Sequence, residues 1–159
     1  MSLSQFLACE GYRQVLLTRN GAGHFVTGGS LAGRPVLVLI DTGANATIVS
    51  LPLARDLGLT LISEGHSGGG AGGAKLETFK LEDTSLTLDH IVPHPKALYA
   101  MDLNHVNAAL ALKGAAPVDV ILGVDVFERQ AAIIDYGSSS LFLKEVYSAR
   151  RDTTSVLSQ

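Results

Sequence analysis

The most constraining feature of the sequence is a run of five apolar residues that leads directly into Asp-Thr-Gly-Ala. Residues 36–40 are rich in β-branched side chains, and a Gly-Arg-Pro segment precedes them. This pattern predicts a short strand that is buried on both faces. Placing a carboxylate at the end of such a strand costs free energy unless the group is hydrogen-bonded or its surroundings are built for a reaction that uses it. Asp41 is therefore a candidate catalytic group, and an ordinary glycine turn is the alternative interpretation.

Length and composition predict one domain with a substantial core. The chain has 159 residues, of which 47% are hydrophobic and 17% are charged, so an intrinsically disordered chain is excluded. The net charge of −3 and the lack of a basic cluster argue against a nucleic-acid partner. No apolar run reaches the length of about 18 residues that a membrane span needs. We expect a single domain over residues 1–159, with a core at 12–147 and flexible arms at 1–10 and 150–159.

The first ten residues lack the basic start and long apolar segment of a secretory signal. A cytoplasmic location is therefore expected for the chain as it stands, and a periplasmic one if a leader has been removed. The single cysteine, Cys9, cannot form an intramolecular disulfide.

A second apolar strand follows about 80 residues after the Asp-Thr-Gly motif. Residues 118–122 lead to Gly123 and a short helix, and residues 133–136 and 141–143 are expected to form a closing hairpin. In this order the features resemble the retropepsin-like aspartic proteases, in their single-domain bacterial form. The resemblance covers roughly residues 24–145. It implies a mainly β fold, a closed acid-protease β-barrel with two or three short helices.

A glycine-rich segment at residues 65–73 admits three interpretations. A solvent-exposed linker and a phosphate-binding loop are possible from composition, but no Gly-Lys-Ser follows. We favour the tip of a hairpin lid, because residues 59–63 and 75–81 can pair on either side of it. The predicted flap glycines are Gly68, Gly69, Gly70, Gly72 and Gly73.

Hydrolysis of a peptide bond by carboxylates needs two of them, one to accept a proton and one to donate a proton. The Asp-Thr-Ser triplet at Asp83 offers a second candidate, but no apolar strand precedes it, so a surface turn is expected there. The second acid is then Asp41 of another copy, which predicts a homodimer with one shared cleft.

The resemblance implies roles for the residues around Asp41. Asp41 would be the general base and, when protonated, the general acid. The Thr42 hydroxyl would bond across the two-fold axis, Gly43 would donate its N–H to the carboxylate, and Ala44 would close the turn. Three residues of the second strand would pack behind this loop and hold it rigid; they are Ile121, Leu122 and Gly123.

No metal or organic cofactor is expected, because a pair of carboxylates needs none for this reaction, and the five histidines are dispersed along the sequence, which argues against a metal site. Asp125 and Glu128 fit the Asp-x-x-Glu pattern of a helix capping box, so Asp125 is expected to be an N-cap. Residues 85–92 are expected to form a strand, and the segment between Pro93 and Pro117 is longer than in viral relatives.

The sequence thus predicts an aspartic endopeptidase that cleaves a peptide or protein substrate. Two alternatives stay open: a dimer of the same fold that binds peptides without cutting them, and a dimerisation domain in which Asp41 only forms a turn.

Overall fold

The computed structural model describes residues 1–68 and 75–146 of the chain. Strands outnumber helices in these ranges, as the sequence predicts, and four helices are present where two or three were expected. The elements are, in order, α1 (Leu3–Cys9), β1 (Tyr12–Leu16), β2 (Thr18–Arg19), β3 (Phe25–Leu31), β4 (Arg34–Ile40), β5 (Thr47–Ser50), α2 (Leu51–Asp56), β6 (Thr60–Gly68), β7 (Lys75–Glu82), β8 (Leu86–Thr87), β9 (Leu98–Met101), α3 (Asn104–Ala111), β10 (Val120–Leu122), α4 (Val124–Arg129), β11 (Ile133–Asp135) and β12 (Ser140–Lys144).

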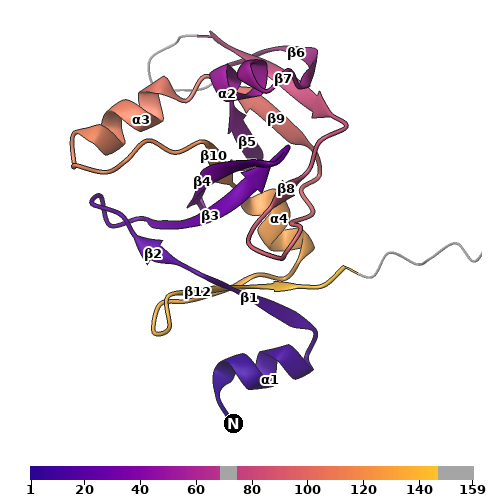
Figure 1. Ribbon diagram of the computed structural model, residues 1–159, viewed down its shortest axis with the longest axis vertical. Coiled ribbons are helices and arrows are strands. Elements are labelled where there is room, and N and C mark those ends of the chain that lie inside the picture. The colour runs from indigo at the N-terminus through magenta and orange to yellow at the C-terminus, as the bar shows by residue number, and fades with distance from the viewer. Residues whose placement is uncertain (69–74, 147–159) are drawn as a thin grey trace, which may run out of the picture.

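The strands form one large sheet and one small sheet (Figure 1). The large sheet has the order β2-β3-β4-β10-β5-β9-β7-β6, with β8 paired to β3, and the small sheet has the order β1-β12-β11. Within the described ranges, the end strands β2 and β6 do not pair with each other, so this sheet does not close. The mainly β character expected from the sequence is therefore confirmed, but the closed barrel is not.

The central strands β4 and β10 are buried on both faces, as the apolar runs predict. They pair in parallel, with Ile121 opposite Leu39. Because side chains alternate along a strand, Val38 and Ile40 of β4 enter the larger core cluster, while Leu39 enters a smaller one on the other face. Ile121 of β10 also enters the smaller cluster. Burying each such side chain contributes about 1.5–3 kcal/mol.

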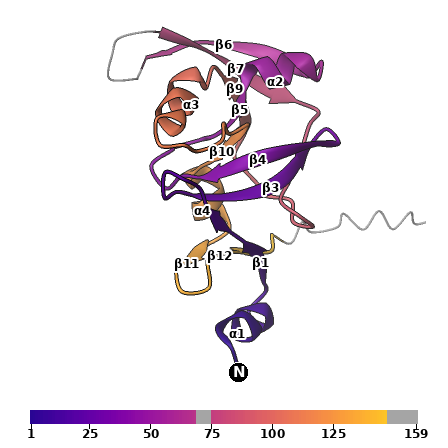
Figure 2. The ribbon, with the colours of Figure 1, turned by 60° about the vertical axis from the view of Figure 1, so that its left-hand side comes forward.

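The helix α3 covers this smaller cluster, next to β10 in both views (Figure 1 and Figure 2). Leu103 and Leu110, at the ends of the helix, are 3% and 4% exposed and pack in that cluster with the central strands. The Asn107 side chain fixes the helix to the chain before β10. Its Nδ2 donates to the Val118 carbonyl at 3.1 Å, and its Oδ1 accepts from the Val118 N–H at 2.9 Å. The long segment before Pro117 is thus docked on the sheet.

The small sheet lies at the end of the molecule that carries the N-terminus (Figure 1). The helix α1 adjoins β1 and begins with a capping box, in which Ser2 Oγ accepts from the Gln5 N–H and Gln5 Oε1 accepts from the Ser2 N–H. The turn after β11 is held by Asp135. Hydrogen bonds from the Ser138 hydroxyl and the Gly137 N–H lower the pKa of its carboxyl group.

The strand predicted at residues 85–92 is shorter in the structure. Asp89 has a φ of +55°, and the chain reverses there. Leu88 and Ile91 therefore bond to each other, at 2.7 and 2.9 Å, instead of continuing along β3. Each helix in the described ranges is too short or too polar to cross a bilayer.

Candidate active site

The Asp-Thr-Gly loop follows β4 directly and is tied together by its own backbone. The Gly43 N–H donates to Asp41 Oδ1 at 2.8 Å, and the Ala44 N–H donates to the Asp41 carbonyl at 3.2 Å. The Asp41 N–H donates to the Leu122 carbonyl at 3.1 Å. Asp41 is half-buried, while Thr42 and Gly43 are exposed. The carboxylate is thus oriented by its own loop and still open to a ligand.

The end of β10 lies against this loop from behind. Ile121 and Leu122 are 5% and 0% exposed. A Cβ atom on Gly123 would lie 2.7 Å from the Ala44 carbonyl oxygen and 2.5 Å from that of Ala46, so only glycine fits. The next residue, Val124, donates its N–H to the Ala44 carbonyl at 2.8 Å. Of the second-strand residues named from the sequence, Leu122 and Gly123 therefore contact the loop that carries Asp41, and Ile121 lies in the core cluster against which Ala44 packs.

The predicted lid segments form an antiparallel hairpin. β6 and β7 pair from Thr60 opposite Glu82 to Gly68 opposite Lys75, with a register shift between Ser63 and His66. In Figure 1 and Figure 2, the described strands of this hairpin stop on the side of the molecule where α3 lies. Gly68 is the last residue of β6. The other predicted flap glycines, Gly69, Gly70, Gly72 and Gly73, lie outside the described residues.

A cavity of about 390 Å³ opens beside Asp41. One wall is α3, and another is the turn before β3, which contributes His24. Asp41 is the only carboxylate among the described residues that line this cavity. The described part of a single copy thus presents one acid at this cavity, where carboxylate chemistry needs two.

The sequence matches a known family over most of this fold. The family model described as aspartyl protease matches residues 27–126, which include β4, the Asp41 loop, the hairpin and β10. The chain belongs to the aspartyl protease family. No curated protein sequence matches it.

Two solved structures of retropepsin-like proteins resemble the fold of this family member. A retropepsin-like aspartic protease from Rickettsia conorii superimposes with a TM-score of 0.54 at 18% identity, covering 83% of this chain and 90% of the other. The retroviral protease-like domain of Ddi1 from Leishmania major gives a TM-score of 0.52 at 18% identity, covering 76% of this chain and 88% of the other. The mainly β, retropepsin-like character expected from the Asp-Thr-Gly-Ala and Ile-Leu-Gly motifs is thus supported, without the closed barrel.

In this aspartyl protease family member, Asp125 is not the N-cap that its sequence pattern predicts. The helix α4 has Gly123 as its N-cap and no side-chain cap bond. Asp125 Oδ1 instead accepts a hydrogen bond from the Thr47 hydroxyl at 2.8 Å. Thr47 is fully buried, and its Oγ1 also accepts from the Gly123 N–H at 3.2 Å. The long-range bond to Thr47 replaces the local cap, and no sequence pattern indicated it.

Thr47 therefore ties the strand that follows the Asp41 loop to the start of α4, and we expect Thr47→Val to destabilise the fold by about 1–3 kcal/mol. Valine keeps the volume but leaves the Gly123 N–H without its acceptor and Asp125 without its donor. Urea unfolding followed by circular dichroism measures the effect. Thr87→Val is the matched control, because the Thr87 hydroxyl makes only a long bond of 3.4 Å to the Ser30 carbonyl. Equal stability of the two variants would contradict the bridging role.

The other motif residues are placed as follows. Asp83 lies in an exposed turn after β7 with a φ of +53°, so the surface turn expected from its sequence context is confirmed. Within residues 1–68 and 75–146, no hydrogen-bond partner is found for the Thr42 hydroxyl. The cross-axis bond implied for Thr42 stays a prediction.

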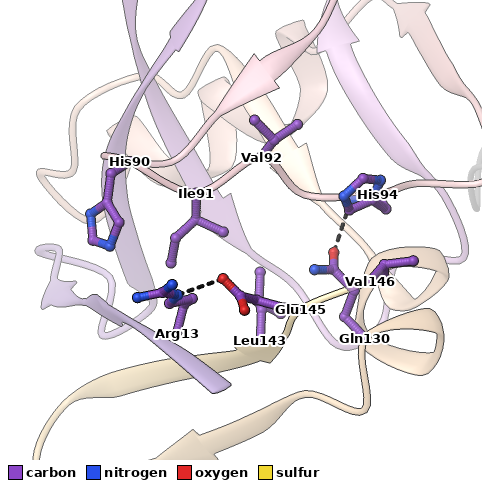
Figure 3. Close-up of a pocket in the computed structure, with 9 residues that line it drawn as sticks. All are labelled: Arg13, His90, Ile91, Val92, His94, Gln130, Leu143, Glu145 and Val146. Carbon is purple, nitrogen blue, oxygen red and sulfur yellow. Dashed lines mark hydrogen bonds and ion pairs between the residues drawn. The ribbon is translucent and has the colours of Figure 1, made fainter. Parts of the chain in front are cut away.

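A second cavity, of about 470 Å³, lies apart from Asp41 between β12 and the chain around His94 (Figure 3). Arg13 Nε and Glu145 Oε1 form an ion pair across it at 2.6 Å. Gln130 Oε1 accepts from the His94 N–H at 2.8 Å. Glu145, the only carboxylate among the described residues that line this cavity, is thus paired with Arg13.

Proposed function

We propose that the chain is an aspartic endopeptidase that works as a homodimer, with the two copies of Asp41 forming one carboxylate dyad. The observation that carries this proposal is the position of Asp41. Asp41 follows a strand that is buried on both faces, and its carboxylate accepts a hydrogen bond from the Gly43 N–H. It also lines a cavity at which the described residues include no second carboxylate. The membership in the aspartyl protease family supports the same chemistry.

The two acids would divide the work of peptide hydrolysis. One ionised carboxylate accepts a proton from the attacking water, and the protonated partner donates to the carbonyl oxygen of the scissile bond. Two like charges about 4 Å apart repel by about 4 kcal/mol at an effective dielectric constant near 20. This corresponds to about three pKa units, so the dyad would hold one proton over an acidic range. Neither a metal nor an organic cofactor is required for these steps.

The surrounding elements would complete the site. The exposed Thr42 side chain is free to contact the second copy, where its hydroxyl would bond across the two-fold axis. Ile121, Leu122 and Gly123 would keep the loop rigid from behind. The β6–β7 hairpin, whose connecting segment is rich in glycine in the sequence, would cover a bound peptide.

The proposal is tested by digesting a mixed peptide library from mildly acidic to neutral pH and identifying the products by mass spectrometry. We expect cleavage that is strongest at mildly acidic pH, that a statine-type inhibitor blocks, and that falls per chain on dilution as dimers dissociate. Peptides that bind but stay intact would instead indicate a non-catalytic peptide-binding dimer. Activity per chain that is constant on dilution, in a protein shown to be monomeric, would exclude the shared site.

A further inference from the structure

We propose that the cavity beside Asp41 is a cationic side-chain pocket that selects peptides with an acidic residue next to the scissile bond. This inference rests on the proposed function, because it takes Asp41 to mark the position of the bond that is cleaved. The class of substrate is thus an acidic peptide segment.

The position of the cavity ties it to the reacting bond. Ile40, the last residue of β4, and Asp41, directly after it, both line the cavity. A peptide whose scissile carbonyl lies at the Asp41 carboxylate would place the adjoining side chain in this hollow. Because the proposed dimer has two-fold symmetry, one copy of the pocket would lie on each side of the scissile bond.

The rim of the cavity carries basic groups without acidic partners. Lys113 is cationic, and His24 and His105 each offer an imidazole N–H that can donate a hydrogen bond. All three side chains are exposed at the rim. Within the described part of the chain, none of them lies within ion-pair distance of a carboxylate. The unpaired positive charge of Lys113, with these N–H donors beside it, would attract a carboxylate.

The floor of the cavity is apolar. Leu39 and Leu110 are 6% and 4% exposed, and Val106 is half-buried. This floor would contact the methylene groups of a glutamate, while the rim would receive its carboxylate. A pocket with an apolar base and a few polar groups at its edge is typical of a site that fixes one ligand orientation.

The walls are held in place, so the pocket is formed before a ligand binds. Asn107 anchors α3 through its two bonds to Val118. The turn before β3 packs closely on the end of α3, since a Cβ atom on Gly21 would lie 3.0 Å from the Lys113 carbonyl oxygen and 3.1 Å from that of Gly114. Binding to a preformed pocket costs less conformational entropy, because its walls do not have to become ordered when the ligand binds.

The test uses two peptides that differ only at the residues flanking the cleaved bond, glutamate in one and glutamine in the other. We expect the parent chain to cleave the glutamate peptide with a kcat/KM about fivefold higher, as suits a partly exposed ion pair. Lys113→Glu should remove or reverse this preference. Lys144→Glu is the matched control, because Lys144 lies on β12 at the other end of the molecule, and it should keep the preference (Figure 1).

The outcomes separate the pocket from the catalytic proposal. Cleavage of both peptides at equal rates, or a preference that survives Lys113→Glu, would overturn the pocket and leave the protease assignment standing. If neither peptide is cleaved, the proposed function fails, and fluorescence anisotropy of the same labelled peptides then tests the pocket alone. Tighter binding of the glutamate peptide that is lost in Lys113→Glu would support it, and equal binding would overturn it.

Discussion

Asp41→Asn is expected to lower the kcat for peptide hydrolysis by at least about 100-fold, with the fold and the dimer unchanged. Asparagine keeps the shape of the side chain and an oxygen that can accept the Gly43 N–H, so the loop can keep its conformation. It cannot accept a proton from water or donate one to a carbonyl oxygen. Initial rates at saturating peptide measure the loss, and circular dichroism and sedimentation check the fold and the assembly.

Asp83→Asn is the control for this substitution. It makes the same chemical change in a triplet that begins with the same two residues, but Asp83 lies in an exposed turn away from the cavity. Asparagine tolerates the positive φ at this position. The control should keep the activity of the parent chain. If Asp41→Asn cleaves peptides as fast as Asp83→Asn, Asp41 is not catalytic.

Gly123→Ala is expected to destabilise the protein by about 3 kcal/mol and to abolish activity. The added Cβ atom would meet the carbonyl oxygens of Ala44 and Ala46 at 2.7 and 2.5 Å. Both contacts are with backbone, which cannot swing aside as a side chain can. The chain either loses the pairing at the end of β10 or displaces the loop that carries Asp41. The free energy of unfolding in urea measures the first effect, and the rate of peptide cleavage measures the second.

Gly28→Ala is the matched control for this glycine. Gly28 is an exposed residue of β3, and a Cβ atom there would meet nothing within 4 Å. This variant should differ from the parent by less than about 1 kcal/mol. A Gly123→Ala variant that does not accumulate as folded protein, beside a folded Gly28→Ala, would support the account. A Gly123→Ala variant as stable and active as the control would refute the close packing behind the loop.

The central strands could be predicted from the sequence because their signal is local. Five apolar residues in a row, directly before Asp41, predict a strand that is buried on both faces. The structure confirms this, because Val38 and Leu39 lie in different core clusters. The Ile-Leu-Gly pattern similarly indicated a strand ending at Gly123, which lies against the Asp41 loop. Both strands could be predicted because a few consecutive residues determine where each strand runs and where it ends.

The features that the sequence did not predict depend on contacts between distant residues. Asp125 fits a capping pattern, but its hydrogen-bond partner, Thr47, is 78 positions away in the sequence. The hydrogen bond to Thr47 determines where the Asp125 side chain lies. The docking of α3 depends on Asn107 and Val118, whose pairing no periodicity indicates. The expected barrel required an edge pairing that the described strands do not make. Local sequence patterns thus predict helices and strands, but contacts between residues far apart in the sequence determine how those helices and strands pack.

The shared site is tested most directly by mixing the parent chain with Asp41→Asn at a fixed total concentration, after subunit exchange. If each dimer needs an intact Asp41 from both copies, activity should follow the square of the parent fraction, and an equal mixture should retain about one quarter of it. If each copy carries a complete site, activity should fall linearly, and the equal mixture should retain about one half. A linear decline would contradict the claim that two chains supply one acid each to a common centre.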